Sequence, residues 1–210
     1  SELGEERIAH AVARHDLDTS RSEVAALQAR IAELTADRER LAQEAREKAE
    51  ALEAMQRTQK ELEERLQQEI AKGSVLISQQ QGELVVDVLD KIVFDSGKAE
   101  LNERGKKVLR QVGETLSAVP DKVILVAGHT DGLPISDKLV DKFPTNWELS
   151  TARATNVVRF LQEELGIPGK RLAAVGYAEF RPVATNRTKA GRSRNRRIEV
   201  RLLPLQQGRR

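Results

Sequence analysis

Two residues of opposite charge, Asp131 and Arg153, stand where they could share one binding site. Asp131 follows an apolar run of strand length at 123–127, and Arg153 lies about two turns into a helix expected from Asn146. Both side chains can therefore reach one cleft at the end of that strand. A carboxylate binds an ammonium group and a guanidinium binds a carboxylate through two hydrogen bonds, so the pair fits an amino-acid zwitterion. The free backbone N–H groups at the helix start also favour an anion.

The same two residues are open to a structural interpretation. Asp131 and Arg153 could pair with each other and orient the loop between them, without any ligand. The residues alone leave both interpretations open.

The sequence does not support catalysis. His129 is the only histidine after residue 15, the chain has no cysteine, and no serine lies in a Gly-x-Ser-x-Gly motif. His129 and Asp131 could supply two metal ligands, but no third ligand follows at a suitable spacing. We therefore expect no enzyme activity, no metal and no cofactor, and we expect His129 to be a packed or hydrogen-bonded residue.

Three ordered strings carry a family resemblance. They are Gly128-His129-Thr130-Asp131-Gly132, then Asn146-Trp147-Glu148-Leu149-Ser150-Thr151-Ala152-Arg153-Ala154, and Asn195-Arg196-Arg197-Ile198-Glu199-Val200-Arg201. Over roughly residues 84–203 the chain resembles the OmpA-like peptidoglycan-binding family, in the MotB-like branch that contains flagellar stator B subunits. The resemblance implies an OmpA-like β/α sandwich that binds the cell wall.

The resemblance also implies roles for individual residues. Asp131 would accept hydrogen bonds from the ammonium group of the diaminopimelate in the stem peptide, and Arg153 would bind its carboxylate. Residues 132–145 make a longer loop than in shorter family members, which bears on the shape of the cleft. Further pocket residues implied by the resemblance are Thr130, Asn146, Leu149 and Ser150, with Arg196 as a supporting contact.

Residues 1–72 are predicted to form one long helix with a coiled-coil seam. No Pro or Gly interrupts residues 5–72, and strong helix formers dominate. We expect a parallel homodimer, with a lone or intramolecularly packed helix as the alternative, and a spacer roughly 100 Å long. The apolar and polar residues of this seam recur in steps of three and four: Val24, Leu27, Ile31, Leu34, Arg38, Leu41, Ala45, Lys48, Leu52, Met55, Gln59, Leu62 and Leu66.

The rest of the chain is predicted to be α+β, with helices on one face of a small mixed sheet. Residues 73–83 are expected to be a linker and a first short strand, 84–203 the folded domain, and 204–210 a tail. The expected elements are strands at 75–77, 84–88, 123–127, 172–175 and 198–202, and helices at 99–119 and 146–165.

Composition places the globular core and the positive charge in the second part of the chain. The six aromatic residues all follow residue 90, and residues 1–72 carry 12 basic and 17 acidic side chains. The basic residues between 187 and 201 are not interleaved with stacking aromatics, so we expect no nucleic acid. The positive charge of these residues is better suited to attracting an anionic cell-wall polymer.

These observations predict a periplasmic anchor that grips peptidoglycan and is attached to a membrane or motor partner. No run of about 18 apolar residues is present, and the chain starts at serine, so we expect the membrane anchor to lie in a missing N-terminal segment. The alternatives are a tether of the outer-membrane or lipoprotein kind without a motor, and an interaction scaffold whose cleft binds no ligand.

Overall fold

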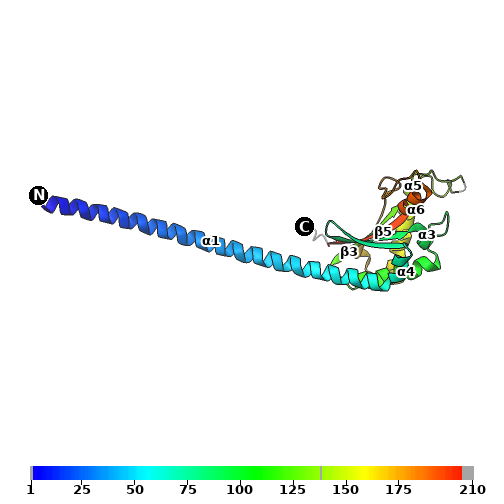
Figure 1. Ribbon diagram of the computed structural model, residues 1–210, viewed down its shortest axis with the longest axis horizontal. Coiled ribbons are helices and arrows are strands. Elements are labelled where there is room, and N and C mark those ends of the chain that lie inside the picture. Colours follow the sequence, from blue (N-terminus) through cyan, green and yellow to red (C-terminus); the bar gives the residue numbers. More distant parts are fainter. Residues whose placement is uncertain (1, 138, 205–210) are drawn as a thin grey trace. The chain divides into compact units, whose positions relative to one another are not determined.

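The computed structural model describes residues 2–137 and 139–204. The chain divides into two compact units, Ser1–Ala54 and Met55–Arg210. The first unit is part of the long helix α1, and the second contains the sheet and the remaining helices (Figure 1). The predicted fold class, a long N-terminal helix followed by an α/β sandwich, is confirmed.

Helix α1 spans Glu2–Arg65, and within the first unit its apolar stripe is exposed. Leu27 and Ile31 are both 63% exposed. Ion pairs one turn apart support the helix, among them Arg40 with Glu44 at 2.9 Å. Among the residues described, no helix combines the length and the apolar character needed to cross a bilayer.

The end of α1 differs from the predicted continuous seam. Leu62 and Leu66 are 0% and 1% exposed and belong to the core of the second unit, so these two seam residues pack within their own chain. The helix ends at Arg65, and a short helix α2 (Gln67–Ala71) follows. Gly73 is the first residue after the predicted helical segment 1–72, and its φ of +63° is the left-handed conformation in which glycine commonly ends a helix.

The second unit is built on a five-stranded sheet in the order β1-β2-β5-β3-β4. Only β3 and β4 are parallel; the other neighbouring pairs are antiparallel. Gln81 and Gly82 join β1 to β2 with φ angles of 52° and 79°, the positive values that a two-residue hairpin turn requires. The strands are β1 (Val75–Gln80), β2 (Glu83–Leu89), β3 (Lys122–His129), β4 (Leu172–Gly176) and β5 (Arg197–Pro204).

The helices pack on one face of this sheet, where alternate residues such as Val86, Val126 and Val200 join the core. Asn102 caps helix α4, and a capping box formed by Thr145 and Glu148 starts helix α5. Helix α6 and the short α3 were not predicted, since neither is long enough to show a period. The helices are α3 (Asp90–Val93), α4 (Glu103–Ser117), α5 (Asn146–Glu163), the 3-10 helix η1 (Gly169–Arg171) and α6 (Lys189–Asn195).

Candidate functional site

Strand ends bring charged residues to one edge of the sheet. Antiparallel pairing places the last residues of β2 and β3 beside the first residue of β5, because Leu89 and His129 both pair with Arg197. Asp90 follows β2 directly, Asp131 follows β3 after one residue, and Arg196 precedes β5. The backbone N–H of Asp90 donates to the carbonyl of Arg196 at 3.0 Å, which ties two of these strand ends together.

Two glycines let helix α5 approach this edge. A Cβ on Gly128 would lie 2.1 Å from the carbonyl oxygen of Ser150, and a Cβ on Gly176 would lie 2.6 Å from the Ser150 hydroxyl. Any residue with a Cβ at position 128 or 176 would clash with Ser150, so only glycine fits there. The first glycine of the Gly128–Gly132 motif therefore permits the close packing that carries Arg153 toward the strand ends.

Four charged residues, which we call the cleft cluster, meet here: Asp90, Asp131, Arg153 and Arg196. The Nη1 of Arg196 pairs with Asp131. Arg153 Nη1 lies 2.7 Å from Asp90, and Arg153 Nε donates to the carbonyl of Lys98 at 3.1 Å. Asp131 and Arg153 thus each have a different partner, and the structural salt bridge between them is not formed. The cluster is balanced, with two charges of each sign.

The cleft cluster retains hydrogen-bonding capacity. Arg153 Nη2 and the Nε and Nη2 of Arg196 have no hydrogen bond among the described residues. The Thr130 hydroxyl, in a residue only 5% exposed, has no partner within the same part of the chain. Buried polar groups are normally satisfied, so the Thr130 hydroxyl marks a place suited to a polar ligand, and the unbonded guanidinium nitrogens offer further donors.

Burial sets the protonation behaviour of the inner pair. Desolvation raises the pKa of Asp90, and the nearby charge of Arg153 opposes that shift. Desolvation also lowers the pKa of Arg153, and here Asp90 opposes it. Each partner therefore offsets part of the desolvation that disfavours the charged form of the other.

The cleft cluster borders a cavity of about 180 Å³. Six of the seven predicted site residues line it: Thr130, Asp131, Asn146, Leu149, Arg153 and Arg196. The loop expected to shape the cleft does contribute, through Leu133, Pro134, Ile135, Ser136 and Leu139.

Ser150 does not line the cavity. Its side chain is fully buried, its hydroxyl donates to the carbonyl of Trp147 at 3.1 Å, and it accepts from the N–H of Ala178 at 3.1 Å. Asn146 lines the cavity but also has a structural role, since its amide donates to the carbonyl of Leu133 at 3.0 Å. The Asp131 carboxylate accepts from the N–H of Leu133 at 3.1 Å, so both residues shape the loop.

Asp90 is the charged lining residue that sequence reasoning missed. Its signal was available, because a carboxylate that follows the predicted strand 84–88 after one residue falls at the same sheet edge as Asp131 once the strands pair. The pairing of that strand with β5 was the missing fact, and hydrophobic periodicity does not reveal which strands are neighbours.

His129 is a packed residue, as predicted. Its ring is 3% exposed and lies 5.4 Å from the ring of Tyr177. Burial, together with the charge of Arg197, lowers its pKa to about 4, so it is neutral at pH 7. In the described part of the chain no group of three potential metal ligands converges.

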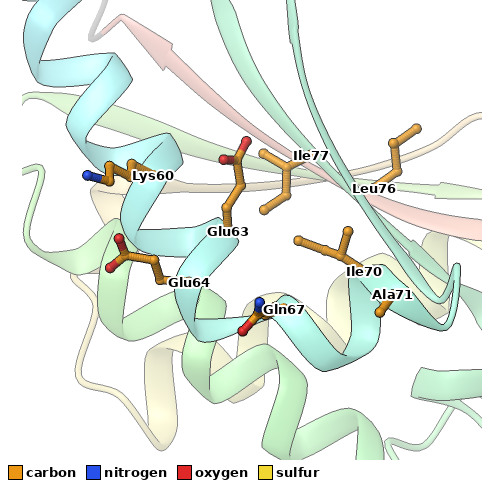
Figure 2. A pocket seen from close by; sticks show the side chains of 8 residues that line it. All are labelled: Lys60, Glu63, Glu64, Gln67, Ile70, Ala71, Leu76 and Ile77. Atoms are coloured by element: carbon orange, nitrogen blue, oxygen red, sulfur yellow. The ribbon is translucent and has the colours of Figure 1, made fainter.

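A larger cavity of about 600 Å³ lies elsewhere in the second unit, between the end of α1, α2 and strand β1. Figure 2 shows Ile70 and Ile77 pointing toward each other, with Lys60 and Glu64 turned away from Ile77. This surface lacks the converging opposite charges of the smaller cavity. Size therefore does not identify the site for a charged ligand, and the chemistry of the lining favours the cleft cluster.

The fold and the strand-end site define a class of domain. Residues 93–196 match the OmpA family, and the compact domain of this chain belongs to that family. Within it the chain is MotB-like. It is 40% identical over 121 residues to motility protein B of Bacillus subtilis, a match that covers 58% of this chain and 45% of that protein. The chain thus spans about half the length of the curated relatives it matches.

Solved structures agree with this assignment. A putative MotB-like protein from Desulfovibrio vulgaris superposes with a TM-score of 0.67 at 27% identity, covering 77% of this chain and 98% of the other. The cell wall anchor of the T6SS from Pseudomonas aeruginosa superposes with a TM-score of 0.61 at 31% identity, covering 69% and 97%.

Proposed function

We propose that this chain is a non-catalytic periplasmic anchor whose compact domain binds peptidoglycan, with the cleft cluster holding the diaminopimelate of the stem peptide. The observation that carries the proposal is the convergence of two carboxylates and two guanidinium groups, with unused donors, on one cavity. The similarity to a cell wall anchor and to motility protein B supports it.

Diaminopimelate suits this arrangement because its side chain ends in both an ammonium group and a carboxylate. The ammonium group would bind Asp131 in place of Arg196, whose side chain is 36% exposed and can move aside. The carboxylate would accept from the unused Nη2 of Arg153 and from the released Arg196. The Thr130 hydroxyl would form a further hydrogen bond with the ligand. The Asp131 contact exchanges one charge-assisted hydrogen bond for another, so breaking its pair with Arg196 offsets part of the gain.

The expected affinity is micromolar to millimolar. A hydrogen bond to a charged group contributes about 1.5–3 kcal/mol, and ordering the ligand and displacing Arg196 offset part of this. Calorimetry with a diaminopimelate-containing tripeptide tests the proposal. Asp131→Asn keeps the acceptor for Leu133 but removes the charge, and it should abolish measurable binding while the fold is retained. Unchanged binding by this variant would reject the assigned role of Asp131.

We also propose that the helical segment forms a parallel homodimer that presents two domains to the wall. The exposed stripe from Val24 to Leu52 is the candidate seam, whereas Leu62 and Leu66 are already used by the core. Two weak sites on one polymer gain from a high effective concentration. Sedimentation equilibrium should give a dimer for residues 1–210 and a monomer for residues 55–210. A monomeric full chain at tens of micromolar, an upper range in which such a coil should associate, would reject the dimer.

A motor-linked role and a tether without a motor remain two versions of the same anchor. The first would attach the chain to a membrane or motor partner through sequence preceding residue 1, and similarity to motility protein B favours it. Deletion of the gene should then abolish swimming while leaving flagellar filaments in place. Normal swimming combined with a detached or blebbing envelope would favour the tether.

A further inference from the structure

Two aromatic side chains, Trp147 and Phe180, lie exposed and stacked on each other. They are 48% and 64% exposed, and their ring centroids are 5.4 Å apart at an interplanar angle of 27°. Phe94, Phe143 and Phe160, by contrast, are at most 6% exposed. Exposed aromatic pairs that are held in place commonly mark a binding surface.

The pair is close in sequence to residues of the cleft, although neither ring lines the cavity itself. Trp147 directly follows Asn146, which lines the cavity, in the first turn of α5. Phe180 lies two residues after Ala178, whose carbonyl accepts from the N–H of Thr130 at 2.9 Å. Both rings are therefore connected through the backbone to residues of the proposed stem-peptide site.

The turn that carries Phe180 is held in an unusual conformation. Ala178 has a φ of +47°, a region that residues with a Cβ rarely adopt. Two hydrogen bonds hold it there, one from its own N–H to the Ser150 hydroxyl and one from Thr130 to its carbonyl. Phe180 closes the turn by donating its N–H to the carbonyl of Tyr177 at 3.2 Å. Ser150, which does not reach the cavity, thus fixes the turn that presents Phe180 to Trp147.

The groove beside Trp147 combines hydroxyl and amide side chains with one carboxylate. Trp147 borders a shallow groove along α5 with Thr151, Thr155 and Asn156. The Glu148 carboxylate in this groove is held by Thr145 in the capping box. A sugar ring offers an apolar face of C–H groups for stacking and a rim of hydroxyl and amide groups for hydrogen bonds. An aromatic pair beside hydroxyl and amide side chains matches that chemistry better than it matches a charged or fully apolar partner.

We infer that Trp147 and Phe180 form a stacking platform for the amino-sugar rings of the glycan strand, beside the cleft for its stem peptide. This inference rests on the proposed function, since the glycan and the peptide belong to the same polymer. A ligand carrying both parts then contacts the rings and the cleft cluster together.

Calorimetry with three probes tests the platform: the stem tripeptide alone, the disaccharide-tripeptide, and a peptide-free tetrasaccharide of the glycan. Wild type should bind the disaccharide-tripeptide about three- to tenfold more tightly than the tripeptide, the range expected for one or two stacking contacts. Binding of either glycan probe should also change the emission of Trp147, which is the only tryptophan in the chain.

Two double variants separate ring stacking from apolar bulk. Trp147→Leu with Phe180→Leu should lose the sugar-dependent gain and keep tripeptide binding, whereas Trp147→Phe with Phe180→Tyr should keep most of the gain. Circular dichroism should show both variants folded. Retention of the gain by the leucine variant, or no gain in wild type, overturns the platform. A leucine variant that only loses self-association would assign the rings to a second copy of the chain and also overturn it.

The outcomes for the platform and for the proposed function can be told apart. If wild type binds the tripeptide but gains nothing from the disaccharide, the platform is rejected and the stem-peptide site stands. If the tripeptide does not bind while the tetrasaccharide binds through the rings, the stem-peptide site is rejected and the platform stands. If neither probe binds, both are rejected.

Discussion

The second unit contains two buried clusters of arginine and carboxylate side chains, and they differ in how completely they are bonded. The cleft cluster borders a cavity and keeps unused guanidinium donors. The other, which we call the sheet cluster, lies on the sheet face opposite the helices. It consists of Glu83, Asp87, Arg197, Glu199 and Arg201.

The sheet cluster is more completely bonded, and Arg201 Nη2 is its one guanidinium nitrogen without a hydrogen bond among the described residues. Arg197 contacts Asp87 and Glu199, both at 3.1 Å, and donates to the carbonyl of Arg181 at 3.3 Å. Arg201 pairs with Glu199 and, at 3.2 Å, with Glu83. Its guanidinium groups and carboxylates bond mainly to one another, so the cluster has a structural role. The comparison teaches that the number of unused hydrogen bonds, and not the presence of buried charge, separates a binding site from a structural ion network.

The largest expected effect is on the sheet cluster. Arg197→Met keeps much of the apolar stem but leaves Asp87 without its partner, which should lower the free energy of unfolding by about 3–5 kcal/mol. Urea denaturation measures this. Arg159→Met is the matched control, because Arg159 forms an exposed ion pair with Glu163 on α5, and it should cost at most about 1 kcal/mol. Equal effects of the two substitutions would show that the sheet cluster contributes no more to stability than an exposed ion pair does.

The next effect concerns pH and His129, which lies 3.6 Å from Glu199 at the margin of the sheet cluster. Its folded-state pKa is lowered from 6.5 to about 4, so the stability it contributes is fully present above pH 6.5. That contribution is lost as the pH falls toward 4, at up to about 1.4 kcal/mol per pH unit. The difference in unfolding free energy between wild type and His129→Gln should change with this slope. A difference that is constant from pH 7 to pH 4 would contradict it.

A smaller but more specific effect is expected in the cleft cluster. Arg153→Lys keeps the positive charge beside Asp90 but removes the planar fork that would bind a carboxylate. Binding of the diaminopimelate tripeptide should weaken at least tenfold, equivalent to about 1.4 kcal/mol. Arg159→Lys, in an exposed pair with Glu163 on the same helix, is the matched control and should bind as wild type does. Equal affinities for all three proteins would exclude Arg153 from the site.

The smallest stability effect is expected at Arg196. Because its side chain is 36% exposed, Arg196→Gln should change the free energy of unfolding by less than about 1 kcal/mol. Binding of the tripeptide should nevertheless fall several-fold, since the released guanidinium would contact the ligand. A variant that is strongly destabilised and binds normally would place Arg196 with the structural pairs instead.

Local patterns were sufficient for most of the fold. Alternating and continuous apolar runs predicted all five strands. The end of the seam was harder to place, because Leu62 and Leu66 keep the same period whether they meet another helix or their own domain. Periodicity specifies a buried face, and it does not specify what covers that face.

The candidate site was predictable where residues follow strands or share a helix face. Asn146, Leu149 and Arg153 recur at helical spacing, and all three line the cavity. Ser150 was misplaced because one helical position turns its side chain away from the cavity, toward the turn after β4, where its hydroxyl accepts from the N–H of Ala178. The partners of the charged residues, Asp90 for Arg153 and Arg196 for Asp131, depend on strand order and could not be obtained from spacing.

The central claim is that the cleft cluster recognises a zwitterionic side chain, and ligand selectivity tests it most directly. Calorimetry should compare two stem tripeptides that differ only in diaminopimelate against lysine, because lysine keeps the ammonium group and lacks the side-chain carboxylate. Loss of one charged hydrogen bond of about 1.5–3 kcal/mol predicts that wild type binds the lysine peptide roughly 10- to 150-fold more weakly. Equal affinity for both peptides would contradict the account.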